Sequence, residues 1–179
     1  MIIIPGWLIA LLTFPGVIVH EAAHQLFCKL RGVAVFDVCY FRPAQNPSGY
    51  VIHEPPRDFL TSFLVATGPL FVNTLLCLLI CFPAFVPVRV FHKAGPIEYV
   101  LLWLGVSIGM HAFPSTHDAK NLLEHARSAA RRLNVLAFLS FPLIVLIYLA
   151  NIGSIVWLDY LYGLAIGLGL PELLIRHLA

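Results

Sequence analysis

Five consecutive residues near the N-terminus combine two imidazoles with one carboxylate. Residues 20–24 read His20-Glu21-Ala22-Ala23-His24. On a helix, positions i and i+4 lie on the same face, so both histidines can bind one metal ion. The glutamate beside the first histidine can take a proton from the water that the metal activates. The pattern therefore predicts a zinc site with His20 and His24 as ligands and Glu21 as general base.

The position of this cluster makes a functional role more probable than a chance match. Residues 1–20 contain no Asp, Glu, Lys or Arg, so the cluster lies at the end of an apolar run. A charged side chain at the centre of a membrane helix costs roughly 2.5–3.5 kcal/mol, and such residues usually serve a function. The alternative is a set of polar residues that extend toward water at the membrane boundary.

A third protein ligand is needed, because catalytic zinc sites use three protein ligands and keep one position open. The candidates lie between residues 110 and 118: His111, His117 and Asp118. We choose Asp118, because the topology described below places it at the same membrane boundary as His24. The alternative role for Asp118 is the N-cap of a short helix over residues 121–127.

The composition indicates an integral membrane protein embedded in the lipid bilayer. Of the 179 residues, 60% are hydrophobic and 11% are charged, with a mean hydropathy of +0.89. Soluble domains carry about 25% charged residues. This excludes an ordinary cytosolic enzyme, a disordered segment and a nucleic-acid-binding domain. The net charge is +2 and the basic residues are scattered, which indicates no nucleic-acid partner.

The charge-free runs are long enough for about five transmembrane helices. A span needs roughly 20 apolar residues, which predicts spans near 5–28, 59–82, 97–117, 133–150 and 153–172. This topology places nine basic residues on one side and two, Arg89 and Lys93, on the other. The positive-inside rule then predicts an N-terminus outside, with the C-terminus and active site toward the cytosol. We treat residues 1–179 as one domain, with a core at 8–125 and additional spans at 133–172.

The segment between the first two spans does not have a helical pattern. Residues 33–41 are rich in β-branched and aromatic side chains, and Asn46-Pro47-Ser48-Gly49 is a strong turn signal before a second such run. We expect a short cytosolic β-hairpin at 33–52, with an irregular loop as the alternative. The fold class is therefore an all-α integral membrane protein with one small hairpin.

Three motifs in order resemble the site-2 protease family of intramembrane zinc metalloproteases. The H-E-x-x-H helix runs into Gly32 and the predicted hairpin. The second span contains Gly68-Pro69-Leu70-Phe71-Val72-Asn73, which looks like the family's G-P-x-x-x-N signature. Pro114 and Asp118 resemble the element that supplies the carboxylate ligand, although His111 stands where the family has Asn. The resemblance covers roughly residues 8–125.

The resemblance implies a zinc-dependent intramembrane endopeptidase with one Zn²⁺ per chain. Its substrates would be membrane-spanning or membrane-associated peptide segments. It also implies that Asn73 contacts the substrate backbone or the reacting carbonyl, with an interhelical hydrogen bond as the alternative, and that Asn73 or His111 assists the zinc in stabilising the oxyanion. Two other functions stay open: a proteolytically inactive zinc-binding membrane scaffold and a metal transporter.

Overall fold

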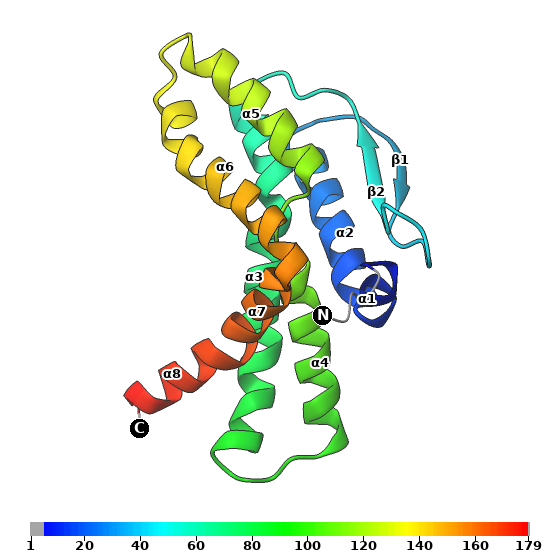
Figure 1. Cartoon of the computed structure of the whole chain (residues 1–179), viewed down its shortest axis with the longest axis vertical. Helices are drawn as coiled ribbons and strands as arrows, with labels where there is room; N and C mark the ends of the chain where they lie inside the picture. The colour runs from blue at the N-terminus through cyan, green and yellow to red at the C-terminus, as the bar shows by residue number, and fades with distance from the viewer. Residues whose placement is uncertain (1–5, 179) are drawn as a thin grey trace.

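The computed structural model describes residues 6–178, and these residues are mostly helical (Figure 1). In chain order, the elements are α1 (Gly6–Leu12), α2 (Phe14–Leu30), β1 (Val35–Cys39), β2 (Tyr50–His53), α3 (Phe59–Arg89), α4 (Pro96–Met110), α5 (Thr116–Ala130), α6 (Val135–Gly153), α7 (Leu158–Leu164) and α8 (Leu170–Leu178). A 3-10 turn connects α6 to α7, and a π-helical turn connects α7 to α8.

Helix α3 is the central element, and its 31 residues extend over about 46 Å. It begins after Asp58, whose carboxylate accepts a hydrogen bond from the backbone N–H of Thr61 at 2.9 Å. Helix α2 packs against it, as do α4 and α5 (Figure 1). Helix α3 is continuous where the neighbouring helices are interrupted. The side chains that meet near its middle therefore all lie beside one unbroken helix.

Helices α4 and α5 run one after the other, antiparallel to α3, and the irregular segment 111–115 separates them. Helix α4 lies along the C-terminal half of α3, where the Cys81 thiol contacts the backbone oxygen of Leu102 at 3.8 Å. Helix α5 lies along the N-terminal half, where Leu122 joins a buried cluster with Phe59 and Ala66. The break between α4 and α5 therefore lies beside the middle of α3.

The C-terminal third of the chain follows a similar broken path. Helix α6 packs on α5, and its Ala137 and Ile144 complete the buried cluster formed with α3 and α5. The chain then turns at Trp157, which has a φ of +67°, in the left-handed region that side chains disfavour. Helix α7 packs on α4, the π-helical turn after it contacts α3, and α8 extends away from α3 (Figure 1).

The β-hairpin expected between the first two predicted spans is present. Strands β1 and β2 pair antiparallel, with Val38 opposite Val51 and Cys39 opposite Tyr50. The hairpin lies beside α2 (Figure 1). Its turn segment, residues 40–49, lies beside α2, where Gly49 approaches Glu21 next to His20.

The prediction of about five transmembrane helices is wrong. Within residues 6–178, three helices are long and apolar enough to cross a membrane: Phe59–Arg89, Val135–Val156 and Leu158–His177. The pair α1 and α2 would make a fourth span, but the pair bends by 89° at Thr13. The expected span at 97–117 ends at Met110 and has only 15 helical residues. A charge-free run measures composition, and it does not reveal where a helix ends.

An ion-pair cluster also contradicts part of the predicted topology. Glu172 binds Arg89 at 2.8 Å and Arg176 at 2.7 Å. The five-span topology assigned these two arginines to opposite sides of the membrane, whereas the structure pairs both with Glu172 at the C-terminal end of α3. The chain from α6 to α8 proceeds in one general direction, so it does not return the C-terminus to the hairpin end.

Candidate metal centre

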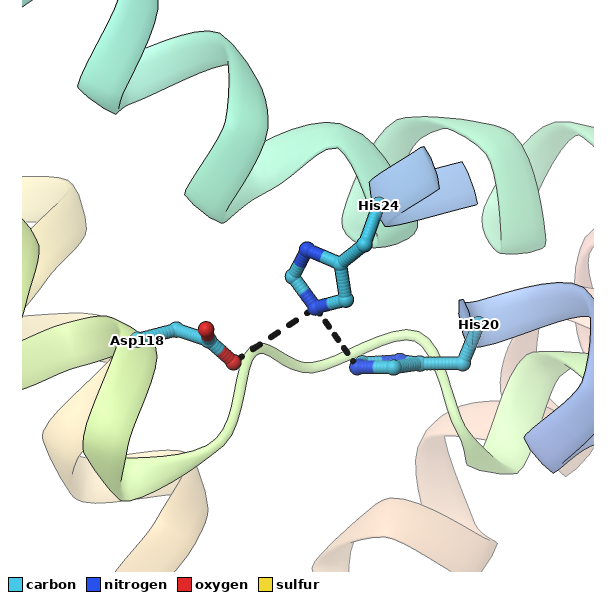
Figure 2. Close-up of side chains that lie close together, drawn as sticks. All are labelled: His20, His24 and Asp118. Atoms are coloured by element: carbon cyan, nitrogen blue, oxygen red, sulfur yellow. Dashed lines mark hydrogen bonds and ion pairs between the residues drawn. The ribbon is translucent and has the colours of Figure 1, made fainter. Parts of the chain in front are cut away.

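Three side chains from two helices converge between α2 and α5. His20 and His24 lie one turn apart on α2, and Asp118 lies in the first turn of α5. One ligand atom from each residue lies within 4.8 Å of the other two, as Figure 2 shows. Among the described residues, this is the group of His, Cys, Asp and Glu side chains placed to hold a metal ion, and it comprises the three ligands expected from the sequence.

A glycine in α2 allows the close helix contact that positions His20. A Cβ atom on Gly16 would collide with the backbone oxygen of Ser107 and lie 2.6 Å from Cδ2 of His111. Helix α2 can therefore approach the C-terminal end of α4 closely enough for His20 to reach the backbone of residue 111. Any larger side chain at position 16 would push the two helices apart.

Backbone carbonyls determine which nitrogen of each histidine faces the centre. Nδ1 of His20 donates to the carbonyl of His111 at 2.7 Å, and Nδ1 of His24 donates to the carbonyl of Val65 at 2.9 Å. A carbonyl can only accept, so both protons lie on Nδ1 and each neutral ring turns the lone pair of Nε2 toward the centre. This is the arrangement that metal-binding histidines commonly have.

The resulting convergence of lone pairs could accommodate a cation. The two Nε2 atoms are 3.1 Å apart, and Nε2 of His24 is 3.5 Å from Oδ2 of Asp118. Without a positive charge between them, two lone pairs and a carboxylate at these distances repel one another. A proton could bridge one pair of atoms, whereas a metal dication would satisfy all three. The donor set of two imidazoles and one carboxylate suits Zn²⁺.

Asp118 is held by the start of its own helix. Ser115 is the N-cap of α5, and its backbone N–H and hydroxyl both donate to Oδ2 of Asp118, at 2.9 and 2.6 Å. Burial raises the pKa of Asp118, but the neighbouring His24 and the bonds from Ser115 outweigh that effect and leave this pKa below its ordinary value. The alternative considered from the sequence was that Asp118 is an N-cap. In the structure, Ser115 is the N-cap of α5 and Asp118 occupies the third helical position.

Glu21 faces a cavity and stands apart from the three converging ligands. It is buried, and with His20 it lines a cavity of about 290 Å³. Residues 46–49 of the hairpin line the same cavity, and a Cβ atom on Gly49 would lie 2.7 Å from Cγ of Glu21. The carboxylate is thus positioned to act on a molecule in the cavity. We call this space the site cavity.

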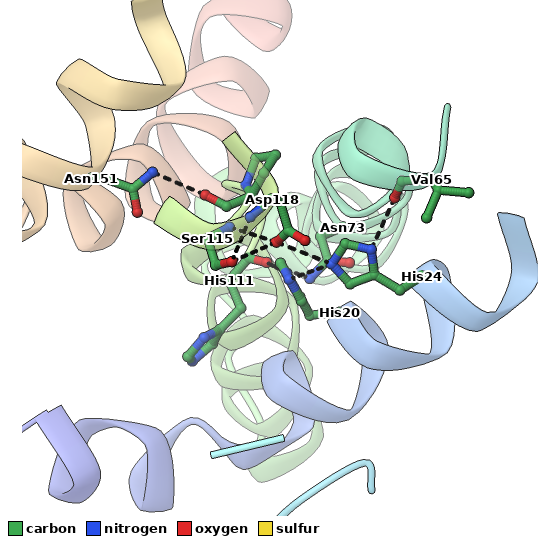
Figure 3. Close-up of polar contacts among 9 residues, drawn as sticks. His20, His24, Val65, Asn73, His111, Ser115, Asp118 and Asn151 are labelled. Atoms are coloured by element: carbon green, nitrogen blue, oxygen red, sulfur yellow. Dashed lines mark hydrogen bonds and ion pairs between the residues drawn. The ribbon is translucent and has the colours of Figure 1, made fainter. Parts of the chain in front are cut away.

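Asn73 joins three helices instead of facing the site cavity. It is fully buried, and its amide nitrogen donates to the carbonyls of Ile108 at 3.1 Å and His111 at 3.0 Å (Figure 3). A weaker contact of 3.4 Å reaches the carbonyl of Gly16 on α2. The geometry matches the interhelical alternative. The His111 carbonyl thus accepts from both Asn73 and His20, which connects α3 to His20.

Neither of the alternative third ligands joins the cluster. Nε2 of His111 lies 2.8 Å from the hydroxyl of Thr13, although the imidazole also lines the site cavity. His117 is exposed and lines a different cavity beside His53 and His125. A bound molecule in the site cavity could therefore contact the His111 side chain but not that of His117.

Ser115 and Asn151 also hold the irregular segment 111–115 in place, and only the role of Ser115 was indicated by the sequence. The spacing of Ser115 and Asp118 matches a capping-box pattern, which was available from the sequence. Asn151 on α6 donates to the carbonyl of Pro114 at 3.0 Å and to that of Ile147 at 2.9 Å (Figure 3). Nothing in the sequence indicated which carbonyl Asn151 would reach.

Comparison of the chain with protein-family models, with curated proteins and with solved structures finds no match.

Proposed function

We propose that this chain is a zinc-dependent intramembrane endopeptidase that resembles the site-2 protease family. The convergence of Nε2 of His20, Nε2 of His24 and the Asp118 carboxylate carries the proposal, because both imidazoles have their tautomer fixed by a backbone carbonyl. Three helices long and apolar enough to cross a membrane support a membrane location. The motif order in the sequence supports the reaction class.

In this proposal, His20, His24 and Asp118 hold Zn²⁺, which supplies Lewis acidity that polarises the scissile carbonyl and activates water. Glu21 accepts the proton of the attacking water and then delivers it to the leaving amine. Its position on the site cavity beside His20, outside the group of three ligands, leaves it free for this role. The His111 imidazole, also on the cavity, is close enough to contact the substrate.

The substrate we propose is a peptide segment that spans or contacts the membrane and is locally unwound. An intact helix uses its own carbonyls in hydrogen bonds, so a carbonyl must be released before it can be attacked. The outer edges of the two-stranded sheet could hold the extended chain by adding a strand. Residues 46–49 place this sheet directly beside Glu21.

The basic residues favour a cytosolic hairpin end. With Arg176 at the end where α3 terminates, eight of the eleven Lys and Arg residues remain at the end formed by the hairpin and α5. We therefore propose that the hairpin and α5 face the cytosol and that Arg89, Lys93 and Arg176 face the opposite side.

The experiment compares purified wild type with Glu21→Gln in detergent or nanodiscs, using a model transmembrane peptide and metal analysis. We expect one zinc per chain in both proteins, and cleavage only by wild type. His24→Ala should lose both zinc and cleavage. Glu124→Gln, which changes an exposed carboxylate on α5, is the matched control and should behave as wild type.

Two outcomes would replace the proposal. Stoichiometric zinc without cleavage by wild type would favour the inactive zinc-binding scaffold. Zinc uptake into sealed vesicles that depends on His20 and His24 would favour the metal transporter.

A further inference from the structure

Asp159 is an acidic residue that the proposed reaction does not use. It lies in α7, within one of the three helices that are apolar enough to cross a membrane. Its carboxylate accepts a hydrogen bond from the backbone N–H of Tyr160 at 2.9 Å, and within residues 6–178 no Lys or Arg forms an ion pair with it. A carboxylate in such a span is costly unless it meets a partner.

The fold directs this carboxylate to the space in front of the metal centre. Asp159 lines the site cavity together with His20 and Glu21. It also lines an adjoining cavity of about 630 Å³, and the two cavities share Asn46, Ser48, His111, Ser154 and Asp159. Volumes of this size lie near the range of about 300–1,000 Å³ that ligand pockets occupy.

The backbone two residues before Asp159 has a strained conformation. Trp157, two residues earlier, has a φ of +67°, which costs a non-glycine residue roughly 1–2 kcal/mol. This residue ends the 3-10 turn after α6 and starts α7, so it determines where the first turn of α7 faces. Strained backbone of this kind is often found at binding sites.

The lining of both cavities lacks a fixed positive charge. Among the described residues, no Lys or Arg lines either cavity, whereas Glu21 and Asp159 both line the first. A carboxylate that faces such a space attracts a cation supplied by a bound molecule. Building on the proposed peptidase function, we propose that Asp159 binds a Lys or Arg side chain of the peptide substrate and so determines which peptides are cleaved.

The size of the site cavity limits where that basic residue lies in the substrate. An extended peptide advances about 3.3 Å per residue. Because Glu21 and Asp159 line the same cavity of about 290 Å³, the basic residue belongs within a few positions of the cleaved bond. The substrates are therefore apolar membrane segments with a Lys or Arg close to the cleavage site.

The test uses a set of membrane-spanning model peptides that differ only in one residue, Lys, Gln or Glu, placed within three positions of the cleavage site. Wild type should prefer the Lys peptide. Asp159→Asn, which has the same shape and can still accept from Tyr160, should lose about tenfold in kcat/KM for the Lys peptide, mainly through KM. The same variant should have the wild-type kcat/KM for the Gln peptide. Asp159→Glu should restore the preference, and Asp159→Lys should shift it to the Glu peptide.

Zinc content and thermal unfolding of each variant provide readouts that do not depend on cleavage. The zinc content and the unfolding temperature of each Asp159 variant should match those of wild type. Glu124→Gln should also match wild type in both properties. A wild type without preference among the three peptides, or an Asp159→Asn protein that keeps the preference for Lys, would overturn the inference.

The inference about Asp159 can still be tested if the proposed peptidase function fails. If wild type with a full zinc content cleaves no peptide, equilibrium binding of the same three peptides replaces kcat/KM. Tighter binding of the Lys peptide that is lost in Asp159→Asn would still support the inference, and equal binding of all three peptides would overturn it.

Discussion

Two of the breaks between helices, at residues 111–115 and at residues 154–157, are built differently. At residues 111–115, carbonyls that lie outside the helices accept hydrogen bonds from side chains. The carbonyl of His111 accepts from His20 and Asn73, and that of Pro114 accepts from Asn151. At residues 154–157, the first three residues are exposed, and the Trp157 N–H donates to the nearby carbonyl of Ser154. Only the first break is held by side chains from other helices.

This difference separates a rigid region from one that can adjust. A metal centre needs ligands held in place by further hydrogen bonds, and the first break supplies them through three helices. The second break carries Asp159 and depends on local contacts, which suits a segment that adapts to different substrates. The comparison predicts effects on zinc binding when the ligands beside the first break, or the hydrogen bonds that hold them, are removed, and none for changes at the second break.

The largest effect is expected for Asp118→Ala. Removing the carboxylate leaves two imidazoles, and we expect the affinity for zinc to fall about a hundredfold. His111→Ala and His117→Ala are the matched controls and should keep their affinity, because neither imidazole joins the cluster. A competition titration with a zinc chelator measures all three. Unchanged affinity in Asp118→Ala, with a loss in either histidine variant, would transfer the ligand role to that histidine.

A smaller effect is expected for Asn73→Leu, which tests whether the first break is held from α3. The carbonyls of Ile108 and His111 lose a buried donor, and we expect the free energy of unfolding to fall by about 2 kcal/mol. Denaturant or thermal unfolding in detergent measures the loss. If stability stays at the wild-type value while kcat falls, Asn73 contacts the substrate and the interhelical role is wrong.

Ser115→Ala should have a smaller effect again. The change removes the N-cap of α5 and one of the donors that orient Asp118. We expect zinc affinity to fall about fivefold, which corresponds to the ~1 kcal/mol that an N-cap contributes. Ser115→Thr retains a hydroxyl and should restore the affinity. Equal loss in both variants would show that packing at this position, rather than the hydrogen bond, is responsible.

The smallest effect is expected for Trp157→Gly at the second break. Glycine relieves the left-handed conformation, while the contact between the rings of Trp157 and Tyr160 is lost. We expect the two effects to offset each other, so that the free energy of unfolding changes by less than about 1 kcal/mol. Zinc affinity should be unchanged. A marked loss of zinc would mean that the two breaks are coupled and that the comparison fails.

Local patterns predicted the local structures of this molecule well. The spacing of His20 and His24 placed both side chains on one helical face, and the run of β-branched residues with its Asn-Pro-Ser-Gly turn predicted the hairpin. Asp118 was found by its position after an apolar run, and the structure places it with the two histidines. Each of these depends on residues that are close in sequence or on a single topological argument.

Contacts between distant segments were not predictable in the same way. The carbonyl of Val65 carries no side-chain signal, yet it determines the orientation of His24. The number of spans was wrong because apolar composition does not show that a helix bends at Thr13 or ends at Met110. The ion pair between Glu172 and Arg89 was likewise not visible, because it depends on the path of the whole chain.

The contact of Gly49 with Glu21 has a kinetic consequence. Because residues 46–49 line the site cavity beside Glu21 and leave no room even for a methyl group at Gly49, an extended peptide can fit into this cavity of about 290 Å³ only after these residues move. Such loop motions occur in microseconds to milliseconds and often limit turnover. The opening of the hairpin turn, measured as a lag or burst before steady-state cleavage, would then set the maximal rate, while the chemical step at the metal centre remains faster.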